Sequence, residues 1–125
     1  MKGPKLGRVQ LRIMEVLWEK GPASAREISD VLNRGERIAH STVQTLLRQL
    51  EAKGAVSHRR QERTFVFYPL VHRANVARTE IRGLVERLFG GSTSGLMAYL
   101  LKEESISRDE LEEIKRLVEA MEEQP

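Results

Sequence analysis

Residues 39–68 contain the pattern that most restricts how this chain can fold: a two-faced helix, a glycine, and two short strands around an arginine-rich turn. The helix is expected to begin at about His40 or Ser41 and to end at Lys53. Gly54 then stands where a left-handed residue often terminates a helix. A helix of this kind followed at once by a hairpin is typical of a winged helix-turn-helix.

The two strands of the hairpin are predicted over residues 55–60 and 64–68. Their side chains alternate, and the second strand is rich in the aromatic and β-branched residues that favour sheets. Pro69 ends the second strand, because proline lacks the amide proton that pairing requires.

Two further helices are predicted before this segment. The first runs from about Leu6 or Gly7 to Lys20 and has two apolar faces, which indicates that it is covered on both sides. Ser24 and Glu27 have the spacing of a capping box that starts the second helix. Three helices followed by a hairpin is the element order of a winged helix.

The segment after residue 71 is predicted to be helical throughout. An apolar stripe extends over residues 72–89, and two glycines end it. Residues 96–101 are apolar nearly all round, which implies burial on every side. Ser107 and Glu110 have the spacing of another capping box. The helix that follows carries apolar residues at steps of three and four, a seam that needs another helix to face.

The predicted fold class is therefore mainly α with a small sheet (α+β): an N-terminal winged helix-turn-helix with a two- or three-stranded wing, then a C-terminal helical region. The predicted domains are residues 1–71 and 72–125. Charge divides at the same place. The first part has 13 Lys and Arg against 7 Asp and Glu, a net charge of +6, and the second has 8 against 11, a net charge of −3. A basic part attracts polyanions, whereas an acidic part avoids them.

Composition excludes several kinds of chemistry. The chain has no cysteine, so disulfides, thiolate metal sites and cysteine nucleophiles are ruled out. Its three histidines, His40, His58 and His72, are not at metal-ligand spacing, and no nucleophile, base or phosphate loop is recognisable. We expect no metal, no cofactor and no enzymatic activity. No apolar run is long enough for a signal peptide or a membrane span, so the expected location is the cytoplasm.

The third predicted helix separates its residue types by face. Val43, Leu46, Leu47 and Leu50 form one stripe, and the hydrogen-bonding residues lie two positions away, roughly 200° around the helix. Gln and Arg side chains bond bidentately to adenine and guanine edges, and Thr can donate or accept. The alternative is an ordinary amphipathic helix whose polar face meets water. The candidate residues for DNA contact in this helix are His40, Ser41, Thr42, Gln44, Thr45 and Arg48.

The hairpin supplies three further candidates, Arg59, Arg60 and Arg63. A wing of this kind can lay guanidinium groups along a phosphate backbone or into a narrow minor groove. Arginines on a hairpin also deter edge-to-edge aggregation. Both roles can hold at once.

The C-terminal part is expected to pair with a second copy of the chain. Regions of roughly 50 to 70 residues bury too little surface to be stable alone, so this acidic part should be stabilised by association with a partner. The candidate interface consists of apolar residues from three helical segments: Leu84, Leu88, Leu96, Tyr99, Leu100, Leu111, Ile114 and Val118.

Three sequence stretches resemble the penicillinase-repressor family, which includes β-lactamase, methicillin-resistance and copper-responsive repressors. They are residues 42–47 (TVQTLL), 53–56 (KGAV) and 65–69 (FVFYP), with weaker similarity at Leu17-Trp18 and through the C-terminal helices. The resemblance implies a homodimeric winged-helix repressor that binds an inverted-repeat operator, a palindrome in double-stranded DNA. It places Ser41, Thr42, Gln44 and Thr45 in the major groove.

The chain departs from this family in three places. Relatives usually carry arginine at the position of Gln49, whereas this chain has Arg48. Copper-responsive relatives end in a cysteine-rich metal hook, which is missing here. Relatives released by a regulatory protease are cut at an Asn-Phe bond, where this chain has Tyr99-Leu100. The resemblance implies a regulatory protease as a further partner, but because the cleaved bond is not the same here, the inducing signal is open.

Two other functions fit the same fold. A winged helix can bind another protein instead of DNA. A transcriptional activator would have the same fold as a repressor, because repression and activation differ by operator position, which the residues do not record.

Overall fold

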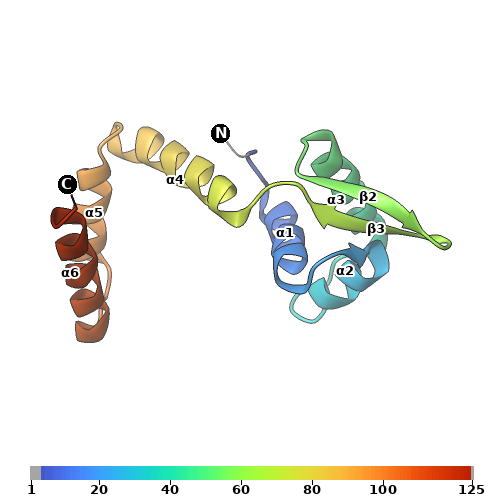
Figure 1. Ribbon diagram of the computed structural model, residues 1–125, viewed down its shortest axis with the longest axis horizontal. Helices are drawn as coiled ribbons and strands as arrows, with labels where there is room; N and C mark the ends of the chain where they lie inside the picture. Colours follow the sequence, from blue (N-terminus) through green and yellow to red (C-terminus); the bar gives the residue numbers. More distant parts are fainter. Residues whose placement is uncertain (1–3, 125) are drawn as a thin grey trace. The chain divides into compact units, whose positions relative to one another are not determined.

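The computed structural model describes residues 4–124. Three helices and a hairpin are followed by three more helices, the order predicted for a winged helix with a helical extension (Figure 1). The elements are α1 (Arg8–Lys20), β1 (Ala23–Ser24), α2 (Ala25–Leu32), α3 (His40–Ala52), β2 (Val56–Gln61), β3 (Thr64–Pro69), α4 (Arg73–Phe89), α5 (Thr93–Glu103) and α6 (Arg108–Glu122).

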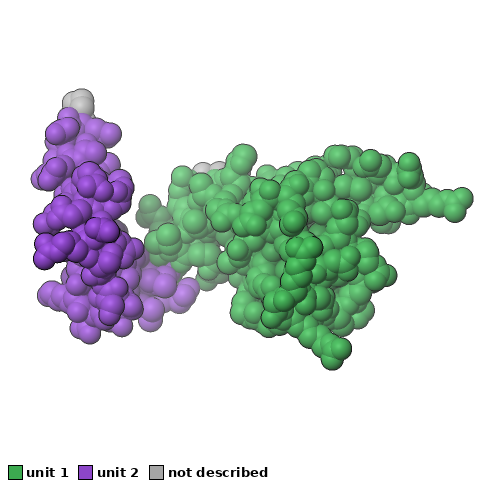
Figure 2. Space-filling model, turned by 90° about the horizontal axis from the view of Figure 1, so that it is seen from below, with its two compact units in different colours: residues 1–83 green, residues 84–125 purple. Residues whose placement is uncertain are grey.

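The chain divides into two compact units, residues 1–83 and 84–125 (Figure 2). The division into domains between residues 71 and 72 stays a prediction, and the boundary between these compact units falls inside α4. The reason is that the start of α4 packs with the first unit. Val76 is buried there, and the Glu80 carboxylate accepts a hydrogen bond from the Leu6 amide at 3.2 Å.

The core of the first unit lies between α1, α2, α3 and the base of the hairpin. α1 contributes residues from both of its apolar faces, as its pattern predicts, and Val9 and Trp18 pack at the margin. The buried hydrophobic residues of this cluster are Ile13, Met14, Val16, Leu17, Ala23, Ile28, Leu32, Val43, Leu47, Leu50, Ala55 and Val56.

The sheet is three-stranded and antiparallel, with strand order β1-β3-β2. β2 and β3 pair from Val56 with Pro69 to Gln61 with Thr64, so a two-residue turn closes the hairpin. The third strand, β1, pairs its two residues with Val66 and Phe67 of β3. A two-residue strand has no alternation to detect, so the sequence left open whether the wing had two or three strands.

Glycine ends α3 as predicted. Gly54 has a φ of +78°, its amide donates to the Glu51 carbonyl at 3.0 Å, and the Ala55 amide donates to the Leu50 carbonyl at 2.9 Å. This pair of bonds is the Schellman motif, which satisfies carbonyls at the helix end. It turns the chain directly from α3 into β2.

The side chain of Asn33 closes the turn between α2 and α3. Its amide nitrogen donates to the carbonyls of Ser29 at 2.8 Å and Ile38 at 2.9 Å, and its oxygen accepts from the Ile38 amide at 2.9 Å. Three bonds from one side chain fix the path of residues 33–38. The start of α3 is thereby positioned against α2.

Glu36 attaches the same turn to α1. Its carboxylate meets the Arg8 guanidinium at 2.9 Å and the Arg12 guanidinium at 2.8 Å. Arg12 also donates to the Leu32 carbonyl at 3.3 Å. The hydrogen bond from Arg8 is the main cause that holds the pKa of the Glu36 carboxyl below its ordinary value, and both arginine charges add to it.

The second unit contains the end of α4, α5 and α6. Gly90 and Gly91 end α4 with positive φ angles, as expected. Ser92 caps α5 by accepting from the Gly95 amide at 2.9 Å. Ser107 caps α6 by accepting from the Glu110 amide at 3.1 Å, which is the serine half of the predicted capping box.

No residue of α5 or α6 is buried within the single chain. The expected burial of residues 96–101 on every side is therefore not met by the chain itself. Met97 is 41% exposed and Leu101 46% exposed, because no element within residues 4–124 covers them. Across residues 4–124, no helix combines the length and apolar character needed to cross a membrane.

Replacing Gly54 by alanine should lower the free energy of unfolding by about 1 kcal/mol, because an L-residue with a side chain is strained in the left-handed region. The added methyl group would meet no atom within 4 Å, so the cost is conformational alone. Urea denaturation at pH 7 measures it. Gly35→Ala is the matched control, since Gly35 lies outside that region. Equal losses in both variants would contradict the role assigned to Gly54.

Replacing Glu36 by glutamine should lower the free energy of unfolding at pH 7. In acid this difference from wild type should disappear. A carboxyl group whose pKa is lower in the folded state stabilises that state at pH values above its unfolded pKa. This contribution disappears as the pH falls through the folded pKa. Unfolding of wild type and Glu36→Gln is compared from pH 7 to pH 2.5. We expect the two to converge below about pH 4. A difference that stays constant over this range would rule out the pairing with Arg8 and Arg12.

Candidate nucleic-acid interface

The first turn of α2 forms the capping box that the sequence predicts. The Glu27 amide donates to the Ser24 hydroxyl at 3.1 Å, and the Ser24 amide donates to the Glu27 carboxylate at 2.9 Å. The bond from the Ser24 backbone is the main cause that lowers the pKa of the Glu27 carboxyl. The box starts α2 directly after β1, which brings the N-terminus of α2 beside the hairpin.

α3 has the two faces that its sequence predicts. Val43, Leu47 and Leu50 are buried, and Leu46 is half-buried. The opposite face is open to solvent from the first turn of the helix to the third. Its exposed residues are Ser41, Thr42, Gln44, Thr45 and Arg48.

Arg48 and Gln49 lie on different sides of α3. The Arg48 guanidinium donates to the Thr45 hydroxyl at 3.2 Å on the exposed face. Gln49 instead accepts a hydrogen bond from the Gln10 side chain of α1 at 3.0 Å, and Gln10 accepts one from Lys53 at 2.9 Å. Gln49 therefore ties α3 to α1. Of the two, Arg48 is the residue on the open face.

His40 begins α3, as expected. Its Nδ1 lies 2.8 Å from the Ser29 hydroxyl, so the imidazole is anchored to α2 and half-buried. This contact positions the N-terminus of α3 against α2.

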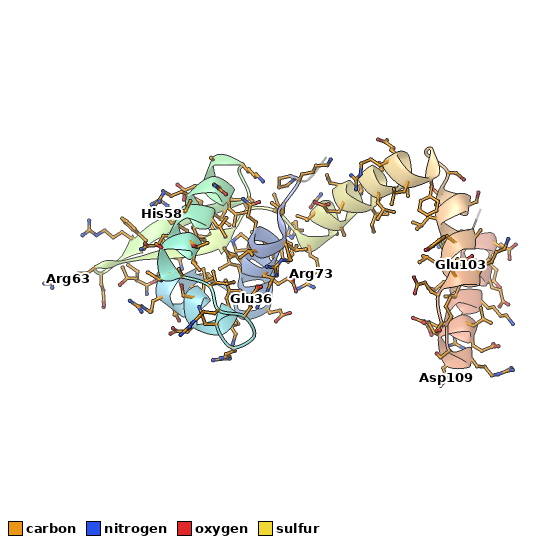
Figure 3. The ribbon with its side chains drawn as sticks, turned by 180° about the vertical axis from the view of Figure 1, so that it is seen from behind. Glu36, His58, Arg63, Arg73, Glu103 and Asp109 are labelled. Atoms are coloured by element: carbon orange, nitrogen blue, oxygen red, sulfur yellow. The ribbon has the colours of Figure 1, made fainter. Side chains whose placement is uncertain are left out.

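The three wing arginines are exposed, but they do not form one cluster. Successive strand residues point to opposite faces of a sheet. Arg59 lies over the Tyr68 ring, with its guanidinium carbon 5.6 Å from the ring centre. Arg60 pairs with Phe65, and both lie on the face of the sheet opposite to that of Arg59 and Tyr68. Arg63 stands at the hairpin tip (Figure 3).

A groove of about 640 Å³ runs between α3 and the wing. Arg48 and His40 line it from α3, and Arg63 lines it from the hairpin tip. Its lining also includes the apolar side chains of Leu47 and Phe67. The groove thus places positive charge on both of its sides, with the hydrogen-bonding face of α3 beside it.

Arg26 also lines this groove, from the first turn of α2. Sequence reasoning did not single it out. Its position depends on how β1 and α2 pack against the hairpin, and nothing in the local pattern distinguishes it from a solvated arginine. The groove is therefore lined by one guanidinium group that the sequence does not predict, that of Arg26, and by two that it does, those of Arg48 and Arg63.

His58 joins the wing to α3. This histidine is considered in the sequence only as a metal ligand, so the contact is not predicted there. Its Nδ1 lies 2.6 Å from the Glu51 carboxylate, and its ring lies 4.8 Å from that of Phe65 and 5.4 Å from that of Phe67. Glu51 places one negative charge in an otherwise basic groove. Within residues 4–124, no group of three or more His, Asp or Glu side chains is arranged to hold a metal.

The residues predicted for pairing of two chains are largely uncovered. Leu88 is 68% exposed, Tyr99 49% and Val118 52%, whereas Leu84, Leu96 and Ile114 are half-buried. Tyr99 meets Phe89 edge-on at 5.9 Å. Leu100 and Leu111 are each 37% exposed.

Comparison with known proteins gives the family. The family model described as "Penicillinase repressor" matches residues 6–120. The penicillinase repressor of Bacillus licheniformis is 24% identical over 118 residues, which cover 94% of this chain and 92% of the relative. The methicillin resistance regulatory protein MecI of Staphylococcus aureus (strain N315) is 22% identical over 114 residues, which cover 91% and 93%.

Solved structures agree with the fold. The DNA-binding domain of the repressor BlaI matches with a TM-score of 0.53 at 29% identity, covering 60% of this chain and 93% of that one. The monomeric form of Bacillus licheniformis BlaI, in complex with the blaP half-operator, gives the same values. A MarR family protein from Bacillus stearothermophilus, 20% identical, shares the fold, with a TM-score of 0.52 over 94% of this chain and 73% of that one.

The family model spans nearly the whole chain, and the curated relatives match it over nine-tenths of their length. The resemblance seen in the sequence is thereby confirmed, and the chain belongs to the penicillinase-repressor family of winged-helix, DNA-binding transcriptional repressors.

Proposed function

We propose that this chain is a sequence-specific transcriptional repressor that binds an inverted-repeat operator as a homodimer. The observation that carries the proposal is the exposed polar face of α3 beside a groove lined by Arg26, Arg48 and Arg63. Phosphate contacts position a protein on DNA, and contacts to base edges give it sequence preference. This surface offers both kinds of group within one unit.

Gln44 and Arg48 are the residues that we assign to base reading. They lie four positions apart on α3, so they follow one another along the exposed face. Gln suits adenine, and Arg suits guanine. Ser41, Thr42 and Thr45 would contact bases or phosphates around them.

The wing and α2 are assigned to the phosphate backbone. Arg26 lines the groove from the first turn of α2, Arg63 from the hairpin tip and His40 from α3. Arg59 and Arg60 lie on opposite faces of the hairpin, so only one of them can reach a DNA strand that lies along the groove. Arg60 shares its face with His58, which points toward α3.

The second unit is assigned to pairing. Exposed large hydrophobic residues are concentrated in α5 and α6, and water-exposed apolar surface of this extent marks an interaction site. The α6 seam of Leu111, Ile114 and Val118 suits a symmetric partner, because a two-fold interface brings the same stripe from both copies together. A partner would also complete the burial that residues 96–101 lack.

Two rivals make different predictions. A protein-binding winged helix would associate with its partner almost independently of salt and would retain no duplex. The basic groove favours DNA over that rival. A transcriptional activator would differ only in where its operator lies, and the repressors among the relatives favour repression.

The DNA face is tested on a duplex selected from a random-sequence library by repeated binding to the protein. Arg48→Ala should weaken binding by about 1–3 kcal/mol and relax base preference at one position of each half-site. Arg63→Ala should weaken binding to all duplex sequences alike. It should also lower the slope of log affinity against log salt concentration by about one unit. Fluorescence anisotropy at several salt concentrations separates the two effects.

Arg116→Ala is the matched control, because Arg116 pairs with Glu113 on the acidic helix α6 and is not assigned to DNA. It should leave affinity and salt slope unchanged. If neither Arg48→Ala nor Arg63→Ala alters binding, the assigned DNA face is wrong.

Pairing is tested by placing a charge on the α6 seam. Val118→Glu should raise the dimer dissociation constant at least about 100-fold, because two copies bring like charges together in an apolar interface. Ala120→Glu is the control, since position 120 lies roughly 200° around the helix from position 118. Sedimentation equilibrium measures both. A wild-type chain that is monomeric at micromolar concentration would contradict the homodimer.

A further inference from the structure

The first two turns of α4 are attached to α1 at two separate points within the first unit. At one point the Trp18 indole donates to the Val71 carbonyl at 3.0 Å, just before α4 begins. At the other, the Glu80 carboxylate accepts from the Leu6 amide at 3.2 Å, just before α1 begins. We call Trp18, Val71, Arg73, Glu80 and Leu6 the α4 clamp.

Arg73 reinforces the first attachment. Its guanidinium carbon lies 5.2 Å from the centre of the Trp18 ring, within range of a cation–π contact. A guanidinium nitrogen also lies 3.9 Å from the Glu19 carboxylate. Both partners of that ion pair are more than half exposed, so the stacking on Trp18 matters more than the ion pair. Val76, between the two attachments, is buried.

Two attachments fix a direction, whereas one fixes only a position. Arg73 and Glu80 are seven residues apart, about 10 Å along a helix at 1.5 Å per residue. Contacts at both points restrict the direction of α4 with respect to α1. A helix held only at its first residue could swing about that residue.

α1 in turn is joined to α3, the helix assigned to base reading and called the reading helix below. Gln10 bonds Gln49 and Lys53 of α3, and α1 shares a buried core with Val43, Leu47 and Leu50. The path from α3 through α1 to the clamp therefore consists of packed helices and hydrogen bonds. The direction in which α4 leaves the first unit is set with respect to α3.

We propose that the α4 clamp sets the half-site spacing that the protein accepts in its operator, with Trp18, Arg73 and Glu80 as positioning residues that contact no DNA. The inference rests on the proposed function. α4 is one continuous helix to Phe89 and is the covalent connection to the pairing unit. A reading helix held in a fixed direction from that connection can meet a second half-site only at certain separations along the duplex.

The consequence for DNA is steep. Adding one base pair between half-sites moves them apart by about 3.4 Å and rotates one by about 35°. A clamped protein should bind one spacing and reject its neighbours. With the clamp loosened, α4 can change direction, so the protein should accept several spacings and bind the best one less tightly.

The test uses the full chain, the selected duplex, a set of duplexes with the spacer changed by one to three base pairs, and a duplex with a single half-site. Wild type should lose at least about tenfold in affinity when one base pair is added or removed. Trp18→Phe and Glu80→Ala should narrow that loss to less than about threefold. Both should bind the single half-site within about twofold of wild type.

Glu80→Gln provides the conservative rescue, because the amide oxygen can still accept from Leu6. It should keep the wild-type spacing profile. Arg82→Ala, an exposed change further along α4, is the matched control. Sedimentation and circular dichroism confirm that each variant is folded and paired.

Three outcomes would overturn the proposal. Variants that keep the wild-type spacing profile would show that the clamp does not set spacing. Variants that lose half-site and full-site affinity in parallel, with an unchanged profile, would show a structural role only. A wild type that binds single half-sites with no preferred spacing would overturn both this inference and the dimeric mode of binding proposed above.

Discussion

Burial of one stripe of α3 is the constraint on which the rest of the structure depends. Val43 and Leu50 are completely buried and Leu47 nearly so, within a core supplied by α1, α2 and the base of the hairpin. Exposing any of them would forfeit roughly 1.5–3 kcal/mol. Because the helix has a fixed period, burial of this stripe obliges Gln44, Thr45 and Arg48 to face solvent. Packing thus determines which side chains are available to a ligand.

Polar contacts then fix the orientation that packing leaves free. Asn33 closes the turn before α3, Gln10 bonds its last turn to α1, and His58 bonds Glu51 to join the wing to the same helix. Each bond alone contributes only about 1 kcal/mol. Acting on three sides of α3, they give the exposed face a defined direction. A site built on a rigid helix loses less entropy when it binds.

Sequence reasoning succeeded where the signal is local. The two faces of α3, the glycine after it, the Ser24 capping box and the paired strands all follow from neighbouring residues. It fell short where the arrangement depends on distant contacts. The bond between Leu6 and Glu80 joins residues 74 positions apart and carries the first compact unit into α4. Arg26 reaches the groove only because the two-residue strand β1 pairs with β3.

In the proposed function the two units have different tasks: the first presents a basic surface to DNA, and the second presents an exposed apolar surface to a second copy of the chain. A hydroxyl-radical footprint of the full chain on its selected duplex tests both tasks in one measurement. We expect two protected patches related by a dyad, each about one major-groove width across. A single protected patch, or uniform cleavage at protein concentrations that saturate binding, would contradict dimeric binding through α3.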